Sequence, residues 1–290
     1  MAGKQQAKGF PSLDNVANVI LVASGKGGVG KSTVAVNLAS ALRLSGHKVG
    51  LLDADIYGPS IPTMLNLHNE VHSSDGKHIE PNEIRGMKVM SMGFLIPPEK
   101  AMIWRGPMLH SAVTQFLRDV HWGTLDYLVV DLPPGTGDVQ LTFAQALSVT
   151  GAVIVSTPQE VALADVIRAR AMFDSVKIPV LGLIENMAYF VCDGCEKKHY
   201  IFAREGARKA AERFGMPFLA ELPLEISVRQ GGDMGMPIVE SEPESPISTT
   251  FMAVAQEVIT RAAAATAKQE ALLAAEAERA SGHRSLPIVN

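Results

Sequence analysis

Short apolar runs recur along the chain, and segments with helical spacing follow them. The runs have strand length and are rich in β-branched residues, which is typical of parallel strands buried on both faces. We predict strands at Val16–Val22, Lys48–Asp53, Leu125–Asp131, Gly151–Ser156, Val180–Glu185 and Pro217–Glu221. We predict helices at Thr33–Leu44, Met108–Asp119, Val139–Ser148, Ala162–Ser175 and Glu205–Phe214. This alternation indicates a single α/β domain with a doubly wound, mostly parallel sheet and helices on both faces.

Two segments interrupt the alternation. Leu67–Glu80 is polar and is expected to form a surface excursion or a short hairpin. It contains His68, His72 and His78, but histidines in polar loops are more often solvated than bound to metal, so no metal site is predicted there. Glu240–Pro246 is expected to be a linker.

The C-terminal segment is rich in alanine, glutamate and lysine, a composition that favours helix. We predict a helix over Thr249–Ala280 whose first half packs on the domain through an apolar face that includes Phe251 and Val258. Large apolar residues become rare after Arg261, so the second half is expected to protrude. The last ten residues are expected to be disordered.

Composition excludes several classes of protein. The 290 residues are 47% hydrophobic and 19% charged, with a net charge of -4, so nothing attracts the whole chain to nucleic acid or anionic membrane. Its apolar runs are shorter than the roughly 20 residues of a membrane-spanning helix. The N-terminal residues have neither a signal-peptide core nor an Arg-rich amphipathic pattern. We therefore expect a cytoplasmic protein without nucleic-acid or membrane partners.

The first predicted strand is followed by GKGGVGKS, from Gly25 to Ser32, which matches G-x-x-x-x-G-K-[ST] completely. Glycines let successive backbone N–H groups face phosphate oxygens, and the N-terminus of the next helix adds a positive dipole. A chance glycine-rich turn is the alternative, but the position between strand and helix favours an ATP site. The residues expected to contact the nucleotide here are Gly25, Lys26, Gly27, Gly28, Val29, Gly30, Lys31, Ser32 and Thr33.

Two acidic segments are expected at the same sheet edge, one at Asp53–Asp55 and one that begins at Asp131. Asp131 ends a buried strand, so we predict that it acts on Mg²⁺ together with the Ser32 hydroxyl. The N–H of Gly135 is predicted to reach the γ-phosphate. An aspartate at a strand end can instead cap a helix, but two such sites beside a phosphate loop favour the nucleotide reading.

Lys26 distinguishes this loop from a general phosphate loop. With it, GKGGVGKS resembles the deviant Walker A motif of a group of dimeric ATPases that includes the division-site and plasmid-partition ATPases, the nitrogenase iron protein and the Mrp iron-sulfur carriers. The resemblance implies that this lysine crosses to the nucleotide of a second copy. It also implies a homodimer that closes on ATP and a slow, Mg²⁺-dependent hydrolysis with Lys26, Lys31 and Asp55 as catalytic residues.

Further stretches narrow the resemblance to one branch. LLDADIYGPSIP (51–62), WRGPM (104–108), DYLVVDLPPGTGDVQLT (126–142) and ENMAYFVCDGCEKKHYIF (185–202) look like the Mrp/ApbC/Ind-type proteins. The likeness covers roughly Val16–Val239 and implies that Asp55 orients the attacking water and that Asn186 contacts adenine. We accordingly divide the chain into an N-terminal tail (1–15), an ATPase domain (16–245) and a C-terminal helix and tail (246–290).

The chain has two cysteines, Cys192 and Cys195, in one CxxC motif. Two thiolates are half of the four ligands that a tetrahedral zinc or a [4Fe-4S] cluster generally takes, but a two-fold dimer supplies all four. The family resemblance points to a bridging [4Fe-4S] cluster on Cys192 and Cys195 of both copies. A structural zinc on the same sulfurs, a dithiol redox switch and an inert pair are the alternatives.

The sequence thus favours an ATP-dependent carrier that transfers a [4Fe-4S] cluster to recipient iron-sulfur apoproteins. The alternative is a ParA/MinD-like positioning ATPase acting on membrane or DNA. A MinD-like protein needs a C-terminal amphipathic helix with bulky apolar and basic faces, whereas Ala262–Ala280 is alanine-rich with both charge signs.

Overall fold

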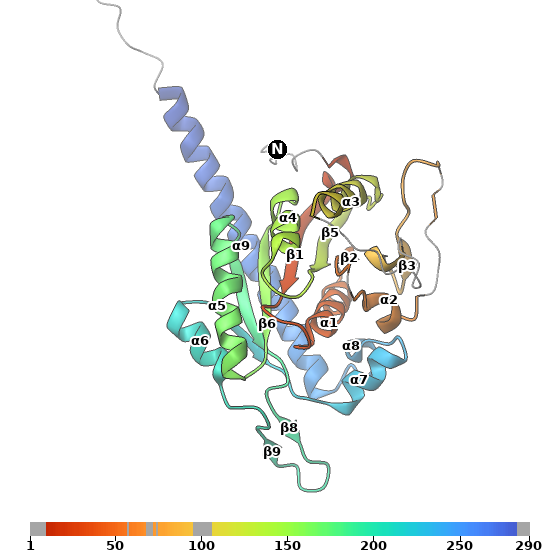
Figure 1. Cartoon of the computed structure of the whole chain (residues 1–290), viewed down its shortest axis with the longest axis vertical. Helices are drawn as coiled ribbons and strands as arrows, with labels where there is room; N and C mark the ends of the chain where they lie inside the picture. The colour runs from red at the N-terminus through yellow and green to blue at the C-terminus, as the bar shows by residue number, and fades with distance from the viewer. Residues whose placement is uncertain (1–9, 57, 68–71, 74, 95–105, 283–290) are drawn as a thin grey trace, which may run out of the picture.

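The computed structural model describes residues 10–56, 58–67, 72–73, 75–94 and 106–282 (Figure 1). An eight-stranded sheet forms the centre, in the order β10-β7-β6-β1-β5-β2-β4-β3. Its strands are β1 (Val16–Ala23), β2 (Val49–Asp53), β3 (Asn82–Ile84), β4 (Met87–Ser91), β5 (Leu125–Asp131), β6 (Gly151–Ser156), β7 (Val180–Glu185) and β10 (Phe218–Glu221). Neighbouring strands are parallel except β3 and β4, which are antiparallel.

Helices cover both faces of the sheet (Figure 1). One face packs on α3 (Gly106–Asp119), α4 (Asp138–Ala146), α5 (Glu160–Ser175) and α6 (Gly206–Phe214). The other packs mainly on α1 (Lys31–Leu44) and α9 (Pro246–Gly282), with α2 (Ile61–Met64), α7 (Ile226–Asp233) and α8 (Ile238–Ser241) beside them. Short 3-10 turns lie at Pro11–Leu13 and Met92–Phe94. The predicted doubly wound α/β architecture is confirmed.

Two strands of this sheet were absent from the prediction. β4 lies beside β2 in parallel, and β3 closes this edge of the sheet. The sequence of β4, MKVMS, has one β-branched residue and interrupts its apolar residues with a lysine, so its burial depends on tertiary packing. The polar excursion before it contains an antiparallel bridge between His72 and Glu80, while His68 lies outside the described residues.

The interpretation of Glu240–Pro246 as a linker was wrong at both ends, because Glu240 and Ser241 belong to α8 and Pro246 begins α9. Glu240 belongs to α8, and its carboxylate oxygens lie 3.2 Å from a guanidinium nitrogen of Arg43 and 3.4 Å from one of Arg85. Half-buried ion pairs of this kind hold α8 against α1 and the β3–β4 turn. The connection to α9 therefore comprises only residues 242–245.

The long C-terminal helix begins inside the core and ends outside it. Phe251, Val254, Val258 and Ala262 of α9 are buried against the sheet. After these turns most described side chains are exposed, and the helix extends beyond the body of the molecule (Figure 1). The predicted packing of the first half and protrusion of the second are confirmed. Ser281 and Gly282, expected to be disordered, are helical, and residues 283–290 lie outside the described range.

Candidate functional site

The phosphate-type loop lies between the end of β1 at Ala23 and the start of α1 at Lys31, at the carboxyl edge of the parallel strands. Gly30 has φ 78° and is the N-cap of α1. A Cβ at Gly30 would lie 2.2 Å from Asn186 Nδ2, and one at Gly25 would lie 2.2 Å from Asp165 Cβ. Glycine is thus required at both positions, because neighbouring elements pack directly on the loop backbone.

Lys31, Ser32 and Asp131 are brought together at this edge. The Lys31 ammonium makes a buried ion pair with the Asp131 carboxylate and lies 3.4 Å from Ser32 Oγ. Burial raises the pKa of Asp131, and the Lys31 charge acts in the opposite direction. The second carboxylate oxygen, Oδ2, is buried and has no hydrogen-bond partner among the described residues. A buried carboxylate oxygen without a donor is suited to a cation or to cation-bound water.

Asp53 and Asp55 follow β2 at the same edge. Asp53 is fully buried and accepts hydrogen bonds from the Asp55 N–H (3.1 Å), the Ile61 N–H (3.2 Å) and Ser91 Oγ (3.1 Å). Burial, with a further contribution from the Asp131 charge, raises the pKa of Asp53 to about 7. Asp55 is also buried, and its carboxylate accepts the Gly58 N–H at 3.1 Å.

Asp53 was predicted only as part of an acidic segment at this edge, without a role of its own, and Ser91 was not predicted at all. Asp53 was visible as the last residue of an apolar strand, the same signal that identified Asp131. Ser91 was not visible, because it belongs to β4, a strand that the pattern did not reveal. The two residues interact only because β4 pairs with β2 in a register that sets Asp53 opposite Ser91.

Three residues that were predicted to contact a nucleotide form hydrogen bonds within the chain in this structure. The Gly135 N–H donates to the Ser24 carbonyl at 3.0 Å, and Lys26 Nζ donates to Gln159 Oε1 at 2.8 Å. Asn186 Nδ2 donates to the Val29 carbonyl at 2.9 Å, which fixes the loop to the end of β7. The one backbone N–H of Gly135 can reach a phosphate only if its hydrogen bond opens, whereas Lys26 and Asn186 each keep further N–H groups. The predicted contacts of Gly135 with phosphate, Lys26 with a second copy and Asn186 with adenine stay predictions.

The cysteines lie in a hairpin that leaves the same edge of the sheet after β7. Its strands are β8 (Phe190–Val191) and β9 (Lys198–His199), and it projects from the body of the molecule (Figure 1). Cys192 is half-buried and Cys195 exposed. The N–H groups of Gly194 and Cys195 point at Cys192 Sγ and lower the pKa of that thiol, which favours the thiolate that binds metal.

The structure of the hairpin helps to distinguish the predicted alternatives for Cys192 and Cys195, which are a bridging cluster, a structural zinc, a redox dithiol and an inert pair. A redox dithiol normally begins a helix, and these cysteines lie in a hairpin turn instead. The two sulfurs and a ring nitrogen of His199 all lie within 4.8 Å of one another. Within the described part of the chain this is the one such grouping of three metal-ligating side chains, so His72 and His78 form none. His199 was not predicted as a ligand.

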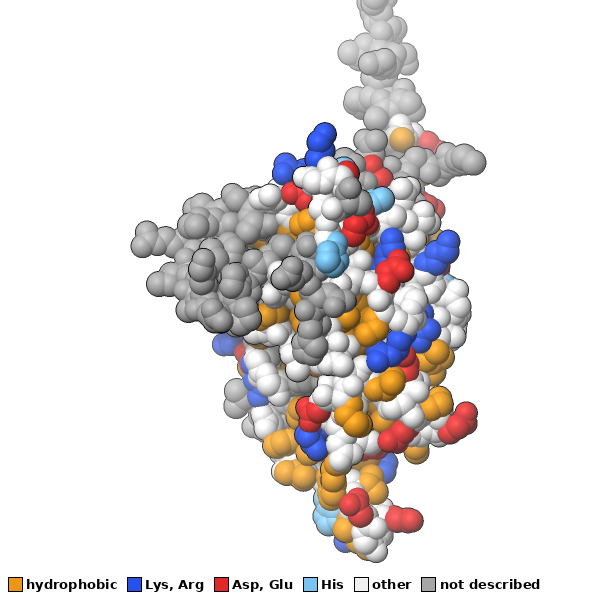
Figure 2. Space-filling view, turned by 90° about the vertical axis from the view of Figure 1, so that its right-hand side faces the viewer, with side chains coloured by type: hydrophobic (Ala, Val, Ile, Leu, Met, Phe, Trp, Pro, Cys, Tyr) orange, Lys and Arg blue, Asp and Glu red, His pale blue; other side chains and the backbone are white. Residues whose placement is uncertain are grey.

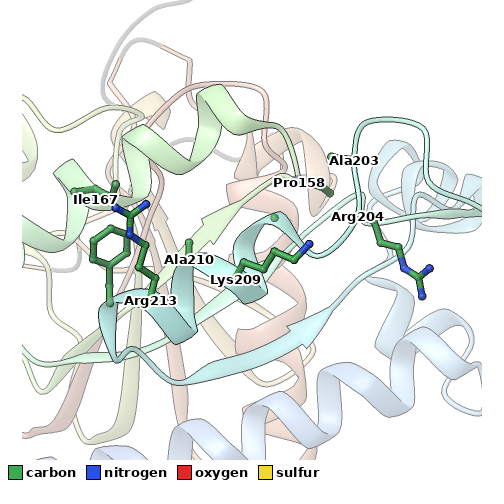
Figure 3. Close-up of a pocket in the computed structure, with 9 residues that line it drawn as sticks. Pro158, Ile167, Ala203, Arg204, Lys209, Ala210 and Arg213 are labelled. Carbon is green, nitrogen blue, oxygen red and sulfur yellow. The ribbon is translucent and has the colours of Figure 1, made fainter.

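A hollow between α5 and α6 lies apart from both sites (Figure 3). Its cationic lining residues are Arg204, Lys209 and Arg213, and its apolar lining residues include Ile167 and Ala210. Arg213 stacks on the neighbouring Phe214 ring at 5.4 Å, and Lys209 lies 3.9 Å from a carboxylate oxygen of Glu205. None of the phosphate-loop residues or cysteines lines this hollow.

Among the described residues no helix has the length and hydrophobicity needed to cross a bilayer.

Comparisons with known proteins agree with this arrangement. An "iron-sulfur protein required for NADH dehydrogenase, mitochondrial" of Arabidopsis thaliana is 50% identical over 248 residues, which are 85% of this chain and 79% of the relative. "Iron-sulfur cluster carrier protein" is the name of relatives in Aquifex aeolicus (53% identical; 84% of this chain, 68% of the relative) and Escherichia coli K12 (49%; 89% and 70%).

Solved structures show the same fold. A nucleotide-binding protein of Archaeoglobus fulgidus, solved with ADP, superposes with a TM-score of 0.72 at 42% identity and covers 83% of this chain and 94% of its own. The cell-division ATPase MinD of Pyrococcus furiosus superposes with a TM-score of 0.64 at 23% identity, covering 84% and 99%. At that identity the second likeness concerns the fold alone.

The model of the ParA family described as "NUBPL iron-transfer P-loop NTPase" matches residues 15–259. This match spans most of the chain and includes the phosphate loop, the acidic strand ends and the cysteine hairpin. The chain belongs to the family of NUBPL-type iron-transfer P-loop NTPases, as its relatives named iron-sulfur cluster carriers also indicate.

Proposed function

We propose that this protein is an ATP-dependent carrier of a [4Fe-4S] cluster. Two copies hold the cluster between them through Cys192 and Cys195 and pass it to recipient apoproteins, while ATP is bound and slowly hydrolysed at Gly25–Ser32. The observation that carries the proposal is that the phosphate loop and the cysteine hairpin both follow strands at the same edge of one sheet. The ADP complex of the Archaeoglobus relative supports the nucleotide half of the proposal. The names of the curated relatives support the cluster half.

The described residues fit ATP with Mg²⁺. Lys31 and Ser32 begin α1, where the loop N–H groups and the helix dipole favour phosphate. ATP would draw Lys31 from Asp131 to the β- and γ-phosphates, leaving Asp131 and the Ser32 hydroxyl to hold the ion. Bound Mg²⁺ would offset charge on the phosphates. Asp55 then orients the attacking water, and Lys26 leaves Gln159 to reach the nucleotide of the second copy.

The surface around the hairpin fits a second copy of the chain. Large apolar side chains are exposed after the hairpin, at Ile201 and Phe202, and beside its base, at Leu224 and Ile226. The Leu224 N–H donates to the Tyr189 carbonyl at 2.7 Å, which places this segment against the start of the hairpin. Figure 2 shows hydrophobic side chains on the lower half of the face that it draws, above the projecting end of the molecule. Burial of such side chains against a second copy would stabilise the dimer that brings four thiolates together.

Anaerobic reconstitution with iron and sulfide tests the cluster half of the proposal. We expect one [4Fe-4S] cluster per two chains and its loss in Cys192→Ala. A variant that retained a full cluster without Cys192 would refute the assignment of the ligands.

A separate experiment tests the role of ATP. Lys31→Ala is expected to lose hydrolysis and cluster transfer to an apoprotein but to load a cluster normally, because Lys31 is at the phosphate loop and not at the hairpin. Lys268→Ala, on the exposed part of α9, is the matched lysine control. Normal transfer by Lys31→Ala would show that transfer does not depend on nucleotide.

A further inference from the structure

His199 lies on the same face of the hairpin as Cys192. Phe190 pairs with His199 and Val191 with Lys198, and the Cys192 N–H donates to the Lys197 carbonyl at 3.1 Å. Alternate residues of a strand share a face, so Cys192 and His199 are diagonal neighbours across the ladder. The backbones of diagonal neighbours are about 7–8 Å apart. An imidazole and a thiol side chain that point toward each other can bridge this distance.

The turn between the strands brings the second sulfur to the same place. Glu196 has φ 56°, and its N–H donates to the Cys192 carbonyl at 2.8 Å, which folds the chain back after Cys195. As a result, both Sγ atoms and a ring nitrogen of His199 lie within 4.8 Å of one another. All three ligand atoms come from one chain.

These separations suit a single ion. Bond lengths of about 2.3 Å to sulfur and 2.0–2.1 Å to nitrogen place the ligand atoms of a tetrahedral zinc roughly 3.5–3.8 Å apart. The side chains therefore need to move by about 1 Å or less to bind one ion. In a [4Fe-4S] cluster each thiolate binds a different iron, so its two sulfurs lie farther apart than two sulfurs on one ion.

The surroundings of the three ligands also fit a divalent cation. Backbone N–H groups of Gly194 and Cys195 point at Cys192 Sγ, and such outer contacts orient a metal ligand and offset its charge. Two thiolates and a neutral imidazole would neutralise a divalent ion. Lys198 is turned to the other face, where its Nζ lies 4.0 Å from the centre of the Tyr189 ring. Cys195 and His199 are exposed, so a fourth position faces solvent.

We propose that each protomer by itself binds one zinc-class divalent ion through Cys192, Cys195 and His199, with the fourth position open. This mononuclear state deepens the proposed function, because it uses the same cysteines as the bridging cluster, but it requires neither a second copy nor sulfide. The ion-loaded monomer and the cluster-loaded dimer are alternative states of one hairpin.

The test uses the full-length, metal-free protein under anaerobic conditions, with Co²⁺ alone as the probe and Zn²⁺ as the competitor. We expect one Co²⁺ per chain on a species of monomer mass, with thiolate-to-cobalt absorption and the strong visible bands of a tetrahedral ion. His199→Ala should weaken Co²⁺ binding at least about 10-fold, since loss of even an outer-shell partner costs that much. His121→Ala, which removes another exposed imidazole, should bind Co²⁺ as the wild type does.

Two results would overturn the assignment. One is an unchanged Co²⁺ affinity and spectrum in His199→Ala. The other is half a Co²⁺ per chain on a dimer with an all-thiolate spectrum. Reconstitution with iron and sulfide separates this proposal from the proposed function. His199→Ala should still form one cluster per two chains, and a wild type that took one Co²⁺ per chain but no cluster would support the mononuclear site while refuting the carrier function.

Discussion

The buried carboxyl of Asp53 should make the stability of the metal-free protein fall as the pH rises from about 4 to about 7. Its pKa is about 7 in the folded chain, against 3.8 for an ordinary aspartate. Because the folded pKa is raised, the folded state retains a proton that the unfolded state has lost over this range. Rising pH therefore favours the unfolded chain until Asp53 ionises in the folded state as well.

The size of the change in unfolding free energy follows from the interval between the unfolded and folded pKa values of Asp53. Between pH 5 and pH 7 the unfolded carboxyl is ionised and the folded one is largely protonated, and each pH unit costs about 1.4 kcal/mol. The free energy of unfolding should thus fall by about 3 kcal/mol between pH 5 and pH 8 through Asp53 alone. Asp131, whose pKa is also raised, acts in the same direction.

Urea denaturation with chelator present, followed by circular dichroism at pH 5 and pH 8, measures this difference. Asp53→Asn should lose about 3 kcal/mol less than the wild type over the same interval, because asparagine does not ionise. Its absolute stability also changes with the hydrogen bonds from Ile61 and Ser91, so the comparison is of the pH dependence only. Asp233→Asn, at an exposed carboxyl of α7, is the control. Equal pH dependence in Asp53→Asn and the wild type would refute the reasoning.

Two further pairs of variants test the loop and the C-terminal helix. Gly28→Ala, at φ 77° with open space around the new Cβ, should cost about 1 kcal/mol in unfolding free energy from backbone strain alone. Gly30→Ala adds the overlap with Asn186 and should lose more stability and most ATP affinity in calorimetry; equal effects of the two changes would contradict the packing argument. Phe251→Ala in buried α9 should cost about 3–5 kcal/mol, whereas Leu272→Ala, 57% exposed, should stay within about 0.5 kcal/mol in urea denaturation. Similar losses for both would show that the two halves of α9 contribute alike.

The strands that could be predicted from sequence are those buried on both faces, because such burial makes their residues continuously apolar. β6 is of this kind throughout, and so are the central residues of β1 and β5, Val19–Ala23 and Tyr127–Val130. The bounds of all three strands were predicted within a residue. The edge strand β3 and its neighbour β4 were missed because polar residues interrupt the apolar pattern of β3 and a lysine interrupts that of β4. Strands whose place depends on partners far along the chain leave little local signal.

The phosphate loop could be recognised from sequence for a different reason. The residues of this loop, Gly25–Ser32, are consecutive, and their chemistry constrains both residue type and spacing. Asp53 and Ser91 meet only through strand register, while the third candidate ligand of the hairpin, His199, depends on which residues face each other across β8 and β9. Contacts that depend on register become visible only with the sheet.

One short segment touches both sites. Asn186 holds the phosphate loop through the Val29 carbonyl, and the hairpin that carries Cys192 begins a few residues later. The Asn186 N–H in turn donates to the Ser156 carbonyl at 2.8 Å, and the Ala188 N–H donates to the Leu222 carbonyl at 2.9 Å. These hydrogen bonds tie the base of the hairpin to the sheet on both sides. The side chain of Asn186 is therefore a direct contact between the phosphate loop and the residues that lead into the cysteine hairpin.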